Sequence, residues 1–174
     1  MGSGDAWADR CSCGQRHWGK YGAAGLLLFR VKGTSVEVLL QLRAEWTHEG
    51  GTWALPGGAI NLIDGRTESA EEAAKREALE EAGIESSQVI YRSEIPTTDH
   101  GTWTYTTVIA STDGDAGAHV ANAESVEVSW FAIDDEGEFP NRDLDTKRLH
   151  SGLRKAWGIL RLEVLRLKDL DSLA

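Results

Sequence analysis

Residues 69–83, SAEEAAKREALEEAG, constrain the fold of this 174-residue chain more than any other stretch. Ser69 followed by Glu72 is a capping box, in which side chain and backbone satisfy each other's free donors, and Gly83 supplies the left-handed residue that ends a helix. At ~100° per residue, one third of the circumference of this predicted helix carries only small or acidic side chains: Ala70, Ala73, Ala74, Glu77, Glu80 and Glu81. The alanines let that face lie close against a sheet, so we expect the three glutamates to point inward or into a cleft.

Three carboxylates at positions i, i+3 and i+4 repel one another, which raises their pKa values and costs stability unless something compensates them. A hard divalent cation resolves the conflict, because Mg²⁺ prefers oxygen ligands and is usually held by one or two carboxylates together with substrate phosphates. The alternative is a solvated helix with i,i+4 ion pairs, each contributing about 0.2–0.5 kcal/mol. The clustering on one face favours a Mg²⁺ or Mn²⁺ site that receives a phosphate.

The rest of the chain predicts several strands and a second helix. Five stretches have the apolar or alternating pattern of strands: residues 22–31, 35–43, 87–95, 102–111 and 126–133. The turn at residues 32–34 joins the first two into a hairpin. A helix is expected from Asp145 or Thr146 to about Lys168, with a core-facing stripe of Leu149, Leu153, Trp157, Leu160 and Val164. Strands mixed with two helices predict an α/β sandwich around a mixed sheet.

Composition limits the range of partners. An apolar content of 41% suffices for one domain with a continuous core. No window approaches a membrane span of ~20 apolar residues and the N-terminus lacks the layout of a secretion signal, so we expect a cytoplasmic protein with no membrane partner. The net charge of −10 argues against polymeric nucleic acid but permits a small phosphorylated substrate whose charge metal ions offset.

The helix and the turn before it carry a specific resemblance. The pattern GG…TESAEEAAKREALEEAGI resembles the signature of the Nudix hydrolase superfamily, which reads G, five residues, E, seven residues, R-E-U-x-E-E-x-G-U, with U aliphatic. From Glu68 to Ile84 the match has no gap, and Ala78 occupies the first U position. The resemblance implies a Nudix-type α/β/α sandwich, with a central mixed sheet and two main helices, over residues 21–174. Residues 1–20 would form an N-terminal extension.

The resemblance also implies roles for individual residues. Glu80 and Glu81 match the metal-ligating pair, and Glu77 matches the glutamate that binds a further metal or orients the attacking water. Arg76 matches the arginine that braces these carboxylates, and Glu68 matches a supporting glutamate.

The glycine turn before the helix is longer than in the family pattern. The backbone carbonyl of Gly57, ahead of Gly58, matches a frequent metal contact. Nine residues instead of five separate Gly58 from Glu68, an insertion that costs only a few tenths of a kcal/mol in closure entropy. The loop is expected to pack down through Ile60, Leu62 and Ile63 and to turn at Asp64-Gly65. We interpret it as a working loop with an insertion, with the roles of Gly57 and Glu68 in question.

A distal glutamate often completes the site in this family. Glu124, six residues before Trp130 as in MutT-like members, is the expected catalytic or metal-linked residue. Glu127 is the second choice, although an outward-facing strand position is the favoured interpretation for it.

The implied activity is divalent-metal-dependent hydrolysis of a phosphoanhydride bond in a nucleoside diphosphate derivative. Markers for other substrates are not convincingly present, which leaves a MutT-like nucleoside triphosphate pyrophosphatase. Trp46, Trp53 and Trp103 could offer a stacking surface for a base, although core or rim positions are the simpler interpretation. The alternative is a sensor or regulator that binds a nucleotide without cleaving it, but such proteins usually lose a signature glutamate. The sequence leaves a homodimer open.

The N-terminal stretch CSCGQRHWG contains the only two cysteines, Cys11 and Cys13, which lie too close together to staple a fold. Reduced thiols fit a cytosolic chain. With His17 they offer three ligands for zinc, whereas a structural zinc site needs four. A small knuckle that packs Trp18 against the first strand is the simpler prediction.

Overall fold

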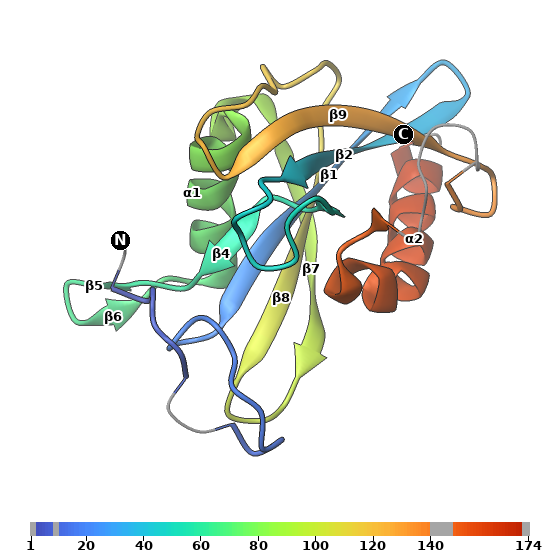
Figure 1. Ribbon diagram of the computed structural model, residues 1–174. Helices are drawn as coiled ribbons and strands as arrows, with labels where there is room; N and C mark the ends of the chain where they lie inside the picture. The colour runs from blue at the N-terminus through green and yellow to red at the C-terminus, as the bar shows by residue number, and fades with distance from the viewer. Residues whose placement is uncertain (1–2, 9–10, 140–147, 172–174) are drawn as a thin grey trace.

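The computed structural model describes residues 3–8, 11–139 and 148–171, in which a mixed β-sheet lies between two helices (Figure 1). The main sheet has the order β3-β2-β1-β8-β7, with β4 paired to β1 and β9 paired to β2. Its strands are β1 (Ala23–Lys32), β2 (Ser35–Arg43), β3 (Trp53–Ala54), β4 (Gly57–Ala59), β7 (Ile90–Asp99), β8 (Thr104–Ser111) and β9 (Ser125–Ile133). The predicted α/β sandwich with a mixed sheet and two helices is confirmed.

Strand β1 organises the sheet. It forms the predicted hairpin with β2, in which Lys32 pairs with Ser35 and Gly33 takes a positive φ of 63°. On its other edge β1 runs parallel to β8, and this pairing makes the sheet mixed. Near its start β1 also pairs with the short strand β4 through Gly25 and Gly57. The glycine turn is thereby fixed to the central strand.

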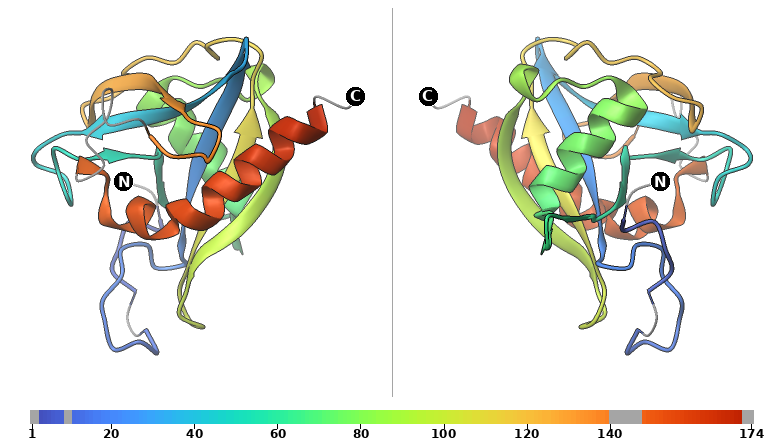
Figure 2. Two further views of the ribbon diagram at one scale, coloured as in Figure 1. Left: turned by 90° about the vertical axis from the view of Figure 1, so that its right-hand side faces the viewer. Right: turned by 90° about the vertical axis from the view of Figure 1, so that its left-hand side faces the viewer.

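Helix α1 (Ala70–Ala82) covers one face of the sheet and helix α2 (Ser151–Asp171) covers the other (Figure 2). The predicted limits of α1 are confirmed, since Ser69 and Glu72 form a reciprocal capping box and Gly83 ends the helix at φ 66°. Two apolar clusters flank the sheet. The cluster beneath α1 includes Ala73, Ala74, Leu26 and Leu28, and the cluster beneath α2 includes Leu153, Trp157, Leu160, Val164 and Phe29. None of the helices in the described part of the chain is long and apolar enough to cross a membrane.

The predicted start of the second helix is wrong in part. The helix begins at Ser151, and the expected starting residues, Asp145 and Thr146, lie outside the described residues. Leu149 is buried but precedes the helix, in an isolated β-bridge with Trp53. The side chain of Glu49 accepts hydrogen bonds from the backbone N (2.8 Å) and Oγ (2.6 Å) of Ser151. The helix thus has a capping acceptor from a distant segment, which no local pattern could indicate.

The inserted loop forms a two-stranded ribbon of β5 (Leu62–Ile63) and β6 (Arg66–Thr67). Asp64 and Gly65 form the predicted turn with positive φ angles of 50° and 83°. Ile60 packs against the core beneath α1, as expected, but Leu62 and Ile63 are exposed, so the expectation that they pack the loop down is wrong. Elements of two or three residues are too short to produce a periodic signal. The strand expected at residues 87–95 begins only at Ile90, because Ser86–Gln88 form a short 3-10 helix.

Candidate active site

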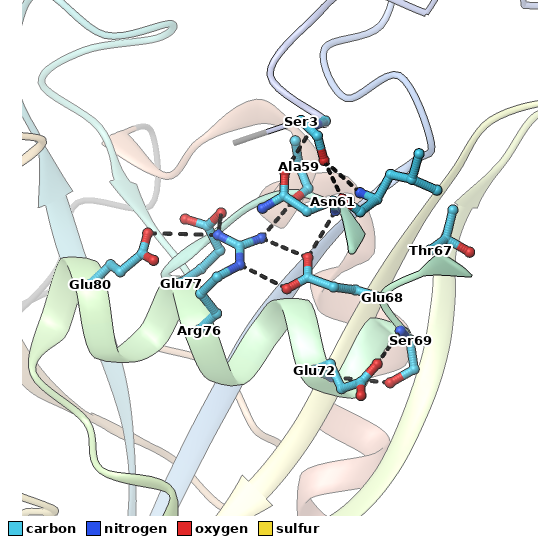
Figure 3. A network of polar contacts seen from close by, with 12 residues as sticks. Ser3, Ala59, Asn61, Thr67, Glu68, Ser69, Glu72, Arg76, Glu77 and Glu80 are labelled. Carbon is cyan, nitrogen blue, oxygen red and sulfur yellow. Dashed lines mark hydrogen bonds and ion pairs between the residues drawn. The ribbon is translucent and has the colours of Figure 1, made fainter. Parts of the chain in front are cut away.

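The guanidinium of Arg76 lies at the centre of a polar network on α1 (Figure 3). Its Nε and Nη2 atoms each donate to a different carboxylate oxygen of Glu68, both at 2.9 Å. Nη2 also donates to the carbonyl oxygen of Ala59 at 2.8 Å. Nη1 donates to Glu77 Oε1 at 2.5 Å and lies 3.6 Å from Glu80 Oε2. One arginine therefore contacts three acidic side chains, which explains how like charges coexist along this helix.

Glu68 has a structural position, with only 6% of the residue exposed. Hydrogen bonds from Arg76 are the main reason that its pKa is lowered. Glu68 also accepts from the backbone N of Asn61 at 2.8 Å, and the Glu68 backbone N donates to the Asn61 carbonyl at 2.8 Å. The Asn61 side chain in turn accepts from the backbone N of Gly4 at 2.7 Å. Glu68 thus connects the inserted loop, and through it the N-terminal segment, to the helix.

The side chain of Glu77 lies against Gly58. Burial raises the pKa of the Glu77 carboxyl despite its contact with Arg76. A Cβ atom at position 58 would stand 2.5 Å from Glu77 Oε1. The position therefore needs glycine for the close approach of carboxylate and backbone.

Glu81 is the most buried acidic side chain of the site, with 2% of the residue exposed. Its Oε2 accepts from Gln41 Nε2 and from the backbone N of Gly57, each at 2.8 Å. Gln41 also accepts a hydrogen bond from Ser125 Oγ. Burial raises the pKa of the Glu81 carboxyl to about 7, although the hydrogen bonds from Gly57 and Gln41 lower it in part.

Gln41 was missed by the sequence reasoning. It lies within the apolar stretch at residues 39–42 of strand β2 and is 1% exposed. An isolated amide in an otherwise apolar run is the signal that could have indicated it, because a buried polar side chain needs a partner.

The sequence predicts that the three glutamates point inward or into a cleft, and the inward position is wrong for Glu80. Its side chain is 53% exposed, whereas Glu77 and Glu81 lie toward the sheet. Among the described residues, the groups of acidic, Cys and His side chains whose ligand atoms lie within 4.8 Å of one another do not include these three. The buried residues of α1 are Ala73, Ala74, Ala78, Glu81 and Ala82. On the helical wheel Glu80 lies at the edge of the arc that they occupy, so its side chain reaches solvent.

The distal glutamates differ in position. Glu124 is exposed, and its backbone carbonyl accepts from Ala44 N at 2.8 Å, which fixes the chain beside β2. The next residue is Ser125, whose hydroxyl reaches Gln41 and so leads to Glu81. Glu127 is exposed on β9 and accepts from Ser129 Oγ at 2.6 Å, the outward strand position expected for it.

The three candidate tryptophans lie in unlike surroundings. Trp46 is 69% exposed, whereas Trp53 belongs to the core beneath α2. Trp103 is only 9% exposed, donates from Nε1 to the Gly19 carbonyl at 3.0 Å and stacks on His17. The surroundings of Trp103 match the core interpretation, and Trp46 retains a free ring surface.

The donor set fits a hard divalent cation. Glu81 is a buried carboxylate whose Oε2 accepts from the neutral donors Gln41 Nε2 and Gly57 N, and the Glu77 carboxylate lies near it on the same helical face. Oxygen ligands of this kind are those that Mg²⁺ and Mn²⁺ prefer. A cation bound here would offset the unfavourable burial of Glu81.

Comparisons with known proteins identify the family of the chain. Residues 20–151 match the family model described as NUDIX domain. The chain is 42% identical over 167 residues to "Putative 8-oxo-dGTP diphosphatase 3" of Mycobacterium tuberculosis (strain ATCC 25618 / H37Rv), covering 92% of this chain and 70% of that protein. It is 47% identical over 152 residues to the "Nucleoside triphosphate pyrophosphatase/Nudix hydrolase fusion protein" of Bifidobacterium longum (strain NCC 2705). That match covers 82% of this chain and 29% of the fusion protein. The crystal structure of RenU, a Nudix hydrolase from M. smegmatis, gives a TM-score of 0.75 at 40% identity, covering 92% of this chain and 95% of that one.

Proposed function

Because the chain belongs to the Nudix family and is a hydrolase of acid anhydrides, we propose that it cleaves a nucleoside triphosphate with the help of Mg²⁺ or Mn²⁺. The observation that carries this proposal is the buried Glu81 carboxylate, held in place by Gln41 and Gly57 beside Glu77. A carboxylate that is costly to ionise in the fold becomes favourable to ionise once a cation binds it.

Glu77, Glu80 and Glu81 and the carbonyl of Gly57 would hold the cation. A bound cation neutralises phosphate oxygens and lowers the pKa of a water ligand. The half-exposed Glu80 can reach a ligand at the surface of α1. Arg76 and Glu68 act by positioning, since their mutual ion pair fixes the helix against the glycine loop.

Glu124 is the proposed general base. Its exposed side chain is free of structural hydrogen bonds among those described, while its backbone is fixed beside β2. A carboxylate on an anchored backbone can accept the proton of the attacking water, a contribution of typically 10²–10⁴-fold in rate. Glu127 lacks this position because it lies on the outward face of β9.

The proposed substrate class is a canonical or oxidised deoxynucleoside triphosphate, as the name of the mycobacterial relative indicates for that protein. The exposed ring of Trp46 offers a stacking surface for a base. A protein of this class would act in the cytoplasm on a small-molecule nucleotide. The sensor alternative remains the weaker proposal, because all the signature glutamates are present.

A hydrolysis screen tests the proposal directly. The purified protein is incubated with Mg²⁺ and, in turn, dNTPs, oxidised dGTP, nucleotide sugars, dinucleoside polyphosphates and ADP-ribose, with EDTA and Glu81→Gln as controls. We expect turnover of a triphosphate that EDTA abolishes and Glu81→Gln lowers by more than about 100-fold. Binding without hydrolysis by the unmutated protein would favour the sensor. Undiminished activity of Glu81→Gln would remove the site assignment.

A further inference from the structure

Four side chains that the proposed reaction does not use meet at the turn of the N-terminal segment. Cys11 Sγ lies 2.8 Å from Cys13 Sγ, which lies 3.0 Å from His17 Nε2. His17 Nε2 in turn lies 3.0 Å from His100 Nδ1, although the two histidines are 83 positions apart. All four ligand atoms lie within 4.8 Å of one another. We propose that Cys11, Cys13, His17 and His100 form a structural zinc site.

The donor set is the one that structural zinc uses. Two thiolates and two imidazoles make a Cys₂His₂ tetrahedron, with Zn–S near 2.3 Å and Zn–N near 2.0–2.1 Å. Such a tetrahedron has ligand-to-ligand edges of roughly 3.3–3.8 Å, so the Cys11–Cys13, Cys13–His17 and His17–His100 pairs need to open by about 1 Å or less. The sulfur separation is well beyond the ~2.05 Å of a disulfide, and the cysteines are free. The soft sulfur ligands favour zinc, whereas the proposed site on α1 has only oxygen ligands and favours Mg²⁺ or Mn²⁺.

Surrounding contacts orient the ligands. The backbone N of Cys13 donates to Cys11 Sγ and the backbone N of Gln15 donates to Cys13 Sγ, each at 3.4 Å. The Trp103 ring stacks on His17 with centroids 4.4 Å apart and an interplanar angle of 18°. The Trp103 carbonyl accepts from the His100 backbone N at 2.9 Å. Outer contacts of this kind fix metal ligands and tune them.

The fourth ligand comes from the turn between β7 and β8. His100 directly follows β7, and Figure 1 shows the N-terminal segment beside that turn. The N-terminal stretch offers only three ligands, and the fourth, His100, lies 83 positions from His17 along the chain. The prediction that Trp18 packs against the first strand is wrong, because Trp18 is exposed and contacts the Trp7 ring edge to face.

The zinc site would fix the N-terminal segment at residues 11–17, and the inserted loop binds the same segment at Gly4. Ala8 N donates to the His17 carbonyl at 2.8 Å and Gly19 N donates to the Ala6 carbonyl at 2.9 Å, so the backbone at residues 6–8 is hydrogen-bonded to the backbone at residues 17–19. At the far end Gly4 N donates to Asn61 Oδ1, and Asn61 N donates to Glu68. Loss of zinc should therefore increase hydrogen exchange of the Gly4 and Asn61 amides.

Zinc content of the purified full-length protein tests the site. The protein is prepared with a thiol reductant, dialysed against excess Mg²⁺ without added zinc, and analysed by inductively coupled plasma mass spectrometry. We expect about one zinc ion per chain and a loss of about tenfold or more in Cys13→Ser and His100→Ala. Glu81→Gln, in the proposed Mg²⁺ site, and His119→Ala, at an exposed histidine outside the cluster, should keep full zinc. Co²⁺-substituted protein should show thiolate-to-cobalt charge-transfer absorption that Cys13→Ser lacks.

Three outcomes would overturn the site. They are zinc-free unmutated protein, equal zinc in Cys13→Ser and the unmutated chain, and a Cys11–Cys13 disulfide that persists in the thiol reductant, revealed by the loss of two hydrogens in the intact mass. Because Cys13 is exposed, its replacement leaves the packing of the fold in place, so failure to fold does not obscure the result.

Discussion

Glu68 and Arg76 form a bidentate ion pair that joins the inserted loop to α1, with both N–O distances at 2.9 Å. The Glu68 side chain is only 3% exposed, and it accepts a third hydrogen bond from the backbone of the inserted loop. The hydrogen bonds raise the pKa of Arg76 and lower that of Glu68, so both groups are charged in the fold. Removing one partner leaves a buried charge without compensation, which costs more than the pair itself contributes.

Arg76→Gln should lower the free energy of unfolding by about 3–5 kcal/mol, measured by urea denaturation. The double variant Arg76→Gln/Glu68→Gln should recover part of that loss, because the uncompensated carboxylate is then absent. Lys75→Gln on the same helix serves as the control. It removes a partly exposed pair with Glu71 and should cost less than about 1 kcal/mol. An Arg76→Gln variant as stable as the Lys75→Gln control would contradict the role of this pair.

Glu81 should make the metal-free protein less stable as the pH rises. Its pKa is raised from 4.5 to about 7 by desolvation, so between these values the folded state keeps a proton that the unfolded state has lost. Stability is therefore greatest below the unfolded pKa and falls as pH rises through about 7, by roughly 3 kcal/mol in total. Urea denaturation in EDTA at about pH 5 and about pH 8 measures the change, and Glu81→Gln should remove most of it.

A second carboxylate provides the control for that measurement. The Glu163 pKa is lowered by hydrogen bonds from Arg166, so Glu163 is ionised throughout this pH window in both states. Glu163→Gln should therefore keep the pH dependence of the unmutated protein. An unmutated protein whose stability does not fall between these pH values would show that Glu81 ionises freely in the fold. Added Mg²⁺ should restore stability mainly at the higher pH, where the carboxylate is available as a ligand.

The sequence predicted α1 and its acidic residues well because their signals are local. The cap at Ser69, the stop at Gly83 and the alanine face all lie within one short stretch. The contacts that build the site around Glu81 join distant segments. Gln41 reaches Glu81 across 40 positions, and no local pattern identifies that partner.

The same limit explains the other missed features. The cap of α2 by Glu49 spans 102 positions, and His100 meets His17 across 83. The error at Glu80 has a different cause. Helical periodicity gives the direction of a side chain relative to its neighbours on the helix, but the extent of the covering sheet decides whether that side chain is buried.

Gly58→Ala should reduce turnover while leaving the fold intact. The new Cβ would meet the end of the Glu77 side chain at 2.5 Å, and a flexible side chain can move aside at a cost of about 0.5–1.5 kcal/mol. Displacement of a catalytic carboxylate by about 1 Å can cost on the order of 100-fold in rate. Gly114→Ala is the control, because its Cβ would meet no described atom within 4 Å. Steady-state kinetics and thermal unfolding of both variants measure the two effects. Full activity of Gly58→Ala would mean that the position of Glu77 is not critical.

Glu124→Gln should reduce kcat by about 10²–10⁴-fold if its carboxylate accepts the proton of the attacking water. Stability should change by less than about 0.5 kcal/mol because the side chain is exposed. Glu127→Gln is the matched control, three residues along the same strand region and also exposed, and its kcat should stay near that of the unmutated protein. The pH dependence of kcat separates a base from a mere electrostatic contribution. A base mutant should lose the acidic limb of the profile, whereas an electrostatic contributor should keep that limb at a lower plateau. If Glu127→Gln rather than Glu124→Gln loses turnover, the strand residue is the base and the hydrogen bond from Ser129 has to open during the reaction.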